Sequence, residues 1–231
     1  MTQDAVRLAV ALAMLLGASV ADLRTRRVPN RYWALFALAA ACFVLADLRS
    51  EPLARLRWTY GLALALALAF YAFWRIGLFG GADAKGLMLL AFLVPGDPPH
   101  QLLVAPYTLA ALLNGSLLLL ALPVLFLAVN ALRGDLRLPA ALLGLRLDTG
   151  RARRLHVWPL ERVDDSGKPQ WQYWQHIARS LDEEYDLLER AGVQRVWVTP
   201  KLPFMVAILA GLALAPWTGN LVLRAMEALA A

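Results

Sequence analysis

Long apolar runs dominate this chain of 231 residues and constrain its fold more than any other feature. Hydrophobic residues make up 60% of the sequence, whereas a soluble globular domain contains about 45–50%. A membrane-spanning helix needs roughly 20 apolar residues, and several of the runs are that long. The run at 84–95 is shorter, and it predicts a short span or a half-span. The apolar runs cover residues 5–21, 32–46, 58–79, 84–95, 102–132 and 202–223.

The composition of these runs predicts helices rather than strands. Leu and Ala dominate them, and the alternation of apolar and polar residues that marks a strand is absent. Because only helices and closed barrels satisfy their backbone groups in lipid, we predict an all-α membrane protein with a bundle of about six transmembrane helices. Residues 1–132 would form five helices, 133–200 a small cytoplasmic α+β insert, and 201–224 the sixth helix.

The first apolar run has two interpretations. Residues 8–21 resemble the core of a secretory signal, and Ser19-Val20-Ala21 has the small-x-small pattern of a cleavage site. However, the only upstream basic residue is Arg7, which Asp4 offsets, and the strong positive charge follows the run. Positive charge favours the cytoplasmic side, so we predict a retained span rather than a cleaved signal.

The distribution of positive charge predicts the orientation in the membrane. With the amino terminus outside and six spans, eighteen of the 23 Lys and Arg residues fall in cytoplasmic loops. The net charge of +6 therefore indicates a lipid bilayer as partner rather than nucleic acid. In this orientation Asp22 and Asp83, which lie at ends of apolar runs, both face the cytoplasm of a multi-pass protein of the cell membrane.

The polar insert contains short regular elements. Ser180-Leu181-Asp182-Glu183 has the pattern of a capping box that opens a helix, and Gly192 is placed to end that helix. Residues 193–198 predict a short strand, and Arg162 to Pro169 predict a turn or loop. Tryptophans favour the headgroup layer, so we expect the insert to lie against the membrane. Its tryptophans are Trp158, Trp171, Trp174 and Trp197.

The cysteine and histidine content argues against a metal site. Cys42 is the one cysteine, so neither a disulfide framework nor a cysteine zinc site forms within one chain. The histidines, His100, His156 and His176, are scattered. We therefore predict no metal and no cofactor.

Two aspartates are the main candidates for chemistry. A carboxylate at the rim of a bilayer is costly, so it is a functional candidate by default. Asp83 follows three small residues, Gly80, Gly81 and Ala82. In a structural interpretation Asp83 is simply the N-cap of a helix and the small residues form a turn. In a functional one, the small residues let a substrate backbone approach closely.

Asp22 closes the first apolar run, where a negative charge at a helix C-terminus is unfavourable. An ion pair with Arg24 or a neighbouring arginine is the structural alternative. If Asp22 and Asp83 meet, the two carboxylates share one proton and can activate water. Asp47 and Asp97 are predicted to lie outside, so they are poor partners for such a pair. Lys85 is more typical of a snorkelling interface lysine than of a catalytic group.

Two motifs identify a resemblance that covers nearly the whole chain. The first is Asp22 followed by Arg26-Arg27-Val28-Pro29-Asn30, and the second is Gly80-Gly81-Ala82-Asp83-Ala84-Lys85. Together they resemble the type IV prepilin peptidase family, which are membrane aspartic proteases with a G-x-G-D motif. The segment from Val196 to Phe204 resembles the archaeal preflagellin (prearchaellin) peptidase branch.

The resemblance implies roles for particular residues. Asp22 and Asp83 match the two catalytic aspartates, and Gly80 matches the first glycine of the motif. Ala82 departs from the motif, because the family has its second glycine there, and we expect a modest restriction of the turn. Lys85, Arg24 and Asn30 are candidate supporting residues. Family members that also methylate carry a cysteine-rich zinc segment, which this chain lacks, so methyltransferase activity is not implied.

The resemblance also implies a substrate class. It predicts an endopeptidase that removes a short basic leader from prepilin-type or prearchaellin-type precursors at the cytoplasmic membrane face. The alternative is a proton-coupled transporter that uses the two aspartates as a relay. A third interpretation is a structural subunit in which both aspartates are paired with arginines.

Overall fold

A computed structural model describes most of the chain, which divides into two compact units. Unit 1 comprises Met1–Leu119 and Pro203–Ala231, and unit 2 comprises Leu120–Leu202. The described residues are 3–25, 27–96, 106–155, 157–164, 167–172, 180–200 and 204–230. Parts of two predicted spans (102–105 and 202–203), Asp97, Arg26, Trp174 and the three histidines lie outside them.

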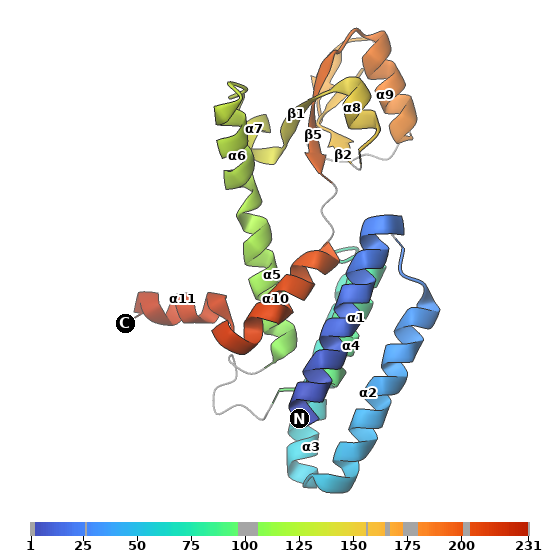
Figure 1. The fold of residues 1–231 in the computed structure, drawn as a ribbon, viewed down its shortest axis with the longest axis vertical. Coiled ribbons are helices and arrows are strands. Elements are labelled where there is room, and N and C mark those ends of the chain that lie inside the picture. Colours follow the sequence, from blue (N-terminus) through green and yellow to red (C-terminus); the bar gives the residue numbers. More distant parts are fainter. Residues whose placement is uncertain are drawn as a thin grey trace. The chain divides into compact units, whose positions relative to one another are not determined.

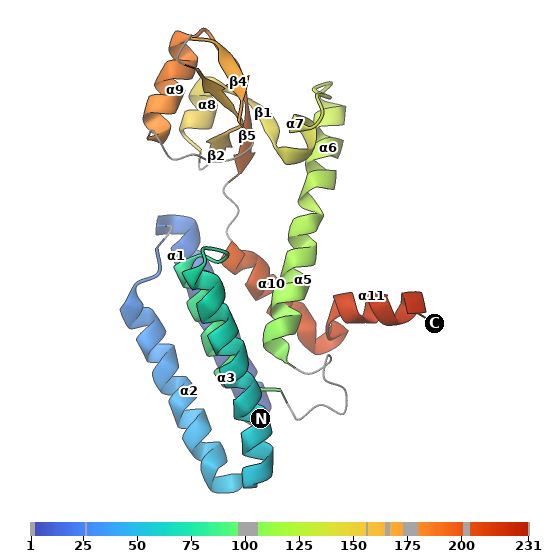
Figure 2. The same ribbon diagram turned by 180° about the vertical axis from the view of Figure 1, so that it is seen from behind.

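Unit 1 consists of helices (Figures 1 and 2). Among the described residues, four helical stretches are long and apolar enough to cross a membrane, and the count rises to five only if the bent pair α10–α11 is taken as one span. The predicted helical membrane protein is therefore confirmed, with the short 84–95 run as the further apolar helix. The helices are α1 (Gln3–Thr25), α2 (Asn30–Ser50), α3 (Leu53–Arg75), α4 (Gly81–Leu93), α5 (Tyr107–Leu120), α10 (Phe204–Thr218) and α11 (Leu221–Ala230).

Helix α4 is short, and the helices around it enclose it. It has 13 residues, fewer than the roughly 20 that a full span requires. It packs against α1, α2, α3 and α10, and Leu87, Leu90 and Leu93 are fully buried. A helix enclosed in this way need not match the thickness of the bilayer, and its position brings its first turn close to its neighbours.

Helix α1 is part of the same core. Ala11, Met14, Leu15 and Ala18 on one side of it are fully buried, and the helix packs against α4 and α10. This packing is what we expect of a retained span rather than of a removed signal.

Helices α5 and α10 carry glycines that meet the partner helix's backbone. A Cβ on Gly115 would collide with the carbonyl of Ala207, and one on Gly211 would collide with the carbonyl of Ala111. Small residues at helix interfaces in membranes allow such close approach. The pair therefore depends on glycine at both positions.

The last apolar run, 202–223, lies in a segment predicted as one helix from 201 to 224, and that helix is broken. Helix α10 ends at Thr218, and α11 continues at an angle of 53°. Gly219 adopts a left-handed backbone conformation with φ of 61°, which favours glycine. The side chain of Asn220 then accepts hydrogen bonds from the backbone N–H groups of Val222 and Leu223, so it caps the new helix.

Unit 2 begins with α6 (Leu122–Leu132), which together with α5 forms the apolar stretch Tyr107–Leu132. Its core packs α9 on the sheet through Leu188, Val196 and Val198. The strands form an antiparallel sheet in the order β1-β5-β2 and a β3–β4 hairpin. The elements are α7 (Ala140–Leu143), β1 (Leu145–Asp148), α8 (Thr149–Arg153), β2 (Val157–Pro159), β3 (Glu161–Val163), β4 (Pro169–Trp171), α9 (Leu181–Arg190) and β5 (Arg195–Pro200).

The local predictions in the insert are largely confirmed. Ser180 and Glu183 form the reciprocal capping box at the start of α9, and Gly192, with φ of 75°, follows the end of that helix. The predicted strand at 193–198 starts two residues later, at Arg195. The predicted loop at 162–169 also contains the ends of β3 and β4, so it is the turn of a hairpin.

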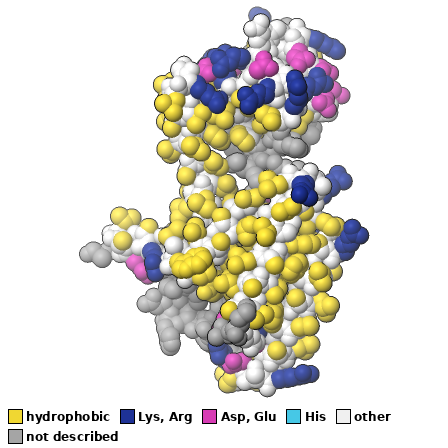
Figure 3. Space-filling view, in the orientation of Figure 1, with side chains coloured by type: hydrophobic (Ala, Val, Ile, Leu, Met, Phe, Trp, Pro, Cys, Tyr) yellow, Lys and Arg dark blue, Asp and Glu magenta, His cyan; other side chains and the backbone are white. Residues whose placement is uncertain are grey.

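The two units differ in their surfaces. In Figure 3, hydrophobic side chains cover most of the visible face of unit 1, whereas charged side chains gather over unit 2. On α2, for example, Leu35 and Leu38 are 62% and 65% exposed. A broad apolar surface of this kind is unfavourable in water, and it is what a helix bundle presents to lipid.

Candidate functional site

The two predicted aspartates lie at the end of α1 and the start of α4, two helices that pack against each other. Asp22 lies in the last turn of α1, and Asp83 is the third residue of α4. Both are half-buried, and their carboxylates are close enough for their charges to interact. Two segments far apart in the sequence thus place two carboxylates within electrostatic range of each other. Their catalytic role stays a prediction.

The glycine-rich turn holds the Asp83 side chain in place. Gly80 is the N-cap of α4, and its backbone N–H donates a hydrogen bond to the Asp83 carboxylate. A Cβ on Gly80 would lie 2.8 Å from Asp83 Oδ2, so only glycine fits at that position without displacing the carboxylate. The structural interpretation of Asp83 as N-cap is wrong, because Asp83 occupies the third position of the first turn and bonds back to the cap.

The two residues between Gly80 and Asp83 have less demanding positions. A Cβ on Gly81 would meet Trp74 Nε1 at 3.4 Å, which is an ordinary contact. Ala82 is helical, and its methyl group packs on the hydrophobic core. The alanine that departs from the G-x-G-D pattern therefore occupies a position where the backbone does not require glycine.

One pair of the predicted supporting residues is in direct contact. Lys85 Nζ donates a hydrogen bond of 2.7 Å to Asn30 Oδ1. Asn30 is the first residue of α2 and Lys85 lies one turn into α4, so the bond ties the starts of these two helices together. Arg24 is exposed, two residues after Asp22 on the last turn of α1. The hydrogen bond between Lys85 and Asn30 thus holds the first residue of α2 against α4.

A second polar cluster lies at the other end of α1, where sequence analysis did not predict one. Asp47 Oδ1 accepts hydrogen bonds from Arg7 at 2.7 Å and from Gln3 at 2.9 Å. Asp47 Oδ2 accepts one from the Tyr60 hydroxyl at 2.6 Å. Arg7 also donates to the carbonyl of Phe43 and lies over its ring. This carboxylate therefore links α1, α2 and α3.

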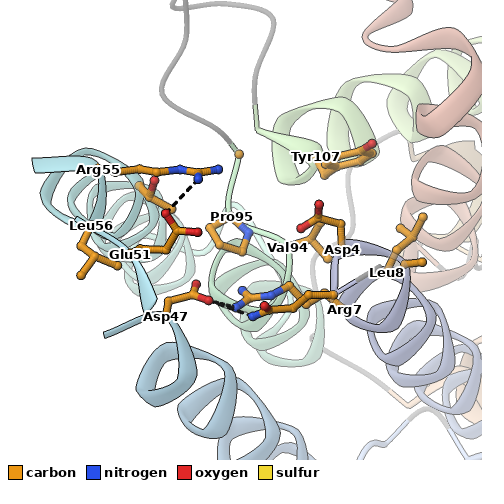
Figure 4. A pocket seen from close by; sticks show the side chains of 14 residues that line it. Asp4, Arg7, Leu8, Asp47, Glu51, Arg55, Leu56, Val94, Pro95 and Tyr107 are labelled. Carbon is orange, nitrogen blue, oxygen red and sulfur yellow. Dashed lines mark hydrogen bonds and ion pairs between the residues drawn. The ribbon is translucent and has the colours of Figure 1, made fainter. Parts of the chain in front are cut away.

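The cluster borders a cavity of about 690 Å³ (Figure 4). In Figure 4 the Arg7–Asp47 pair and the Arg55–Glu51 pair both face this space. Both oxygens of Asp47 already accept hydrogen bonds from protein donors, so Asp47 is poorly suited to act as a base. The sequence signal for this cluster was Arg7, which lies inside the apolar run 5–21, and Asp47, which directly follows the run 32–46.

No group of three or more possible metal ligands occurs in the part of the chain that the structure describes. That part contains none of the histidines.

Comparison with known families agrees with this geometry. A model of the type IV leader peptidase family matches residues 9–129, which is more than half of the chain and contains both aspartates. The chain belongs to the type IV leader peptidase family. A second model, for the C-terminal region of archaeal A24 peptidases of type II, matches residues 136–221. The resemblance inferred from the two motifs is confirmed.

A relative of known activity covers nearly the same length. A preflagellin peptidase from Methanococcus voltae is 24% identical over 244 residues, which span 93% of this chain and 96% of the relative. As a member of this family, the chain is a leader-cleaving protease with several membrane-spanning helices. These comparisons give no support to the transporter interpretation.

Proposed function

We propose that this leader peptidase is an aspartic endopeptidase in which Asp22 and Asp83 form the catalytic pair. The observation that supports the proposal is the position of these two carboxylates, at the end of α1 and the start of α4, within electrostatic range of each other. Paired carboxylates close to each other cannot easily both ionise, so they share a proton. That is the arrangement that aspartic proteases use to activate water.

The chemistry follows from this shared proton. The ionised carboxylate takes a proton from a water molecule while the protonated one donates its proton to the scissile carbonyl oxygen. The water oxygen bonds to the carbonyl carbon and gives a tetrahedral intermediate. When the C–N bond breaks, the protonated carboxyl gives its proton to the leaving nitrogen. One hydroxyl of the intermediate returns its proton to the other carboxylate as the carbonyl re-forms, so the pair again holds one proton. Its titration belongs to the pair rather than to either residue.

We propose prepilin-type or prearchaellin-type precursors as the substrates, since the Methanococcus voltae relative is a preflagellin peptidase. Such a precursor carries a short basic leader before a hydrophobic helix. A pair at the ends of helices can reach a bond just before a substrate's spanning helix, whereas a relay for transport would favour the middle of the membrane. The concentration of Lys and Arg in the adjoining loops supports a cytoplasmic active site.

The residues around the pair have proposed supporting roles. Gly80 leaves room for the Asp83 carboxylate, and together with Gly81 and Ala82 it gives a substrate backbone access. The bond between Lys85 and Asn30 would keep the loop after Asp22 in place. Arg24, exposed in the last turn of α1, would lie beside the entering substrate.

The test is a cleavage assay in membranes with a candidate precursor. Wild type, Asp22→Asn and Asp83→Asn are compared at equal amounts, and the new amino terminus of the product is determined by mass spectrometry. We expect wild type to remove the leader and neither variant to do so. Normal cleavage by either variant would exclude the proposed pair. Failure of wild type on several precursors would refute the proposed substrate class.

A further inference from the structure

Helix α11 has two chemically different sides. Arg224 and Glu227 lie three residues apart and therefore on one side of the helix. The opposite side carries Val222, Met226 and Leu229, which follow the i, i+4, i+7 spacing of an amphipathic helix. Met226 is 60% exposed and Leu229 is 88% exposed. Met226 and Leu229 on this apolar side are thus uncovered by the rest of unit 1, whereas Val222 is half-buried.

The corner before α11 is held by specific hydrogen bonds. The buried side chain of Asn114 on α5 donates to the carbonyl of Gly219 and accepts from the N–H of Leu221, each at 2.9 Å. Asn220 caps the first turn of α11. Because one amide side chain bonds to both flanks of the break, the 53° bend is a built feature of the fold. Figure 1 and Figure 2 show α11 running away from the line of α10.

The alternative is a broken span in which α11 completes the crossing that α10 begins. Helix α10 has 15 residues, about 22 Å, which is shorter than the hydrocarbon core of roughly 30 Å. A completed crossing, however, would carry Arg224 and Glu227 toward the acyl chains, where charged groups are costly. Orientation along the membrane surface keeps both charges among the headgroups. Trp217, at the end of α10, is 79% exposed, and tryptophan favours that layer.

We infer that α11 is an interfacial helix whose apolar side, Val222, Met226 and Leu229, binds the headgroup–acyl boundary of the bilayer at the end of α10. The bilayer is the expected partner of this apolar side, because α11 directly follows α10, a helix of the bundle that is embedded in lipid. Helices with one apolar and one charged side lie in this plane. Since α10 packs against both α1 and α4, this contact would also fix the depth of the helices that carry Asp22 and Asp83.

The inference is tested by measuring depth residue by residue. In the full-length protein with Cys42→Ala, single cysteines at positions 222 to 229 are spin-labelled after reconstitution into liposomes. Accessibility to oxygen and to a water-soluble nickel complex then gives the depth of each label. Labels at 117, 118 and 120, on the exposed side of α5, provide the reference for a span.

We expect depth to oscillate along α11 with the helical period, with labels at 222, 226 and 229 in the acyl boundary and labels at 224 and 227 in the headgroup layer. A steady change in depth from 222 to 229 would overturn the inference in favour of a broken span. Full water access at every position would overturn it in favour of a helix away from the membrane.

A matched pair of substitutions provides a second readout. Leu229→Glu places a charge on the apolar side, and we expect it to increase the nickel accessibility of a label at 222 several-fold. Arg224→Gln, on the charged side, should leave that accessibility unchanged. Equal effects of the two substitutions would contradict an oriented contact with the bilayer.

Discussion

The two ends of α1 each contain a carboxylate cluster, and the clusters differ in how their charges are compensated. At one end, Asp47 accepts three hydrogen bonds, and one of its donors, Arg7, carries the compensating charge. At the other end, Asp83 lies within electrostatic range of a second carboxylate, Asp22, and accepts a backbone hydrogen bond from Gly80.

This difference suggests that the cluster around Asp47 serves stability, whereas the pair Asp22 and Asp83 serves the chemical reaction. A buried charge with matched hydrogen-bond donors holds its neighbours together. Two acids that face each other are unfavourable for folding but can exchange a proton with a substrate. The comparison therefore predicts that substitutions at the two ends have opposite effects on activity and stability.

The largest expected effect is on catalysis, and it concerns the two aspartates as one unit. Asp22→Asn and Asp83→Asn should each reduce the cleavage rate by about 10²–10⁴-fold, because each removes the acid–base exchange. The double variant should be no slower than either single one, since groups that act together are strongly non-additive. Initial rates of precursor cleavage measure all three. If the rate loss of the double variant equalled the product of the two single losses, the aspartates would act independently.

The next effect is on stability, at the other end of α1. Asp47→Ala leaves Arg7, 4% exposed, without its partner, and should cost about 3–5 kcal/mol of unfolding free energy. Cleavage per folded molecule should remain close to wild type. Denaturant unfolding in detergent, followed by tryptophan fluorescence, gives the first quantity.

Glu51→Gln is the matched control, because Glu51 pairs with Arg55 in the same region but is 33% exposed. A surface pair contributes only about 0–1 kcal/mol. If Glu51→Gln destabilised the protein as much as Asp47→Ala, burial of the Arg7–Asp47 pair would not explain its importance.

A smaller effect is expected for the hydrogen bond between Lys85 and Asn30, which adjoins the acidic pair. Lys85→Met and Asn30→Ala should each reduce kcat/KM by about three- to tenfold, because the start of α2 loses one bond worth roughly 0.5–1.5 kcal/mol. The double variant should lose no more than either, and Lys85→Arg should restore part of the rate. Additive losses would mean that Lys85 acts on the substrate rather than through Asn30.

Much of this arrangement follows from the sequence, because apolar run length and the positive-inside pattern place Asp22 and Asp83 at helix ends on one side. The cluster around Asp47 does not follow. Run boundaries give the axial position of Asp47 but not the rotation of α2 about its axis, and that rotation decides whether the carboxylate meets Arg7 or solvent.

The broken helix shows a second limit of the sequence argument. The run from 202 to 223 is largely apolar, and its average hydropathy conceals the break at Gly219 and Asn220. The local signal was present, since glycine followed by asparagine favours a turn. Its partner, Asn114, is distant in the sequence, so no local pattern predicts the bonds that fix the corner.

The smallest expected effect lies outside the bundle, where charges are paired near the surface of unit 2. Burial raises the pKa of Asp135, but hydrogen bonds from Arg195 and Arg146 and their charges outweigh burial and hold that pKa below its usual value. A carboxyl whose pKa is lower in the folded state stabilises the fold above its unfolded pKa of about 3.9. That contribution is lost as the pH falls through the folded pKa.

Asp135→Asn should therefore destabilise the strands β1 and β5 by roughly 1 kcal/mol at neutral pH, and the difference from wild type should disappear in strong acid. Hydrogen exchange of the two strands, measured at matched pH for both proteins, checks this. If wild type and Asp135→Asn still differed in hydrogen exchange after Asp135 is protonated, the effect would come from altered packing rather than from the lost charge.

The most direct measurement sets the two ends of α1 against each other in one preparation. Asp83→Asn and Asp47→Asn are purified in parallel, and the cleavage rate per folded molecule and the thermal unfolding midpoint are measured for each. We predict that Asp83→Asn unfolds close to wild type, because asparagine keeps an oxygen for the Gly80 N–H, yet does not cleave. Asp47→Asn should cleave normally and unfold at a lower temperature. Cleavage by Asp83→Asn at the wild-type rate would contradict the account.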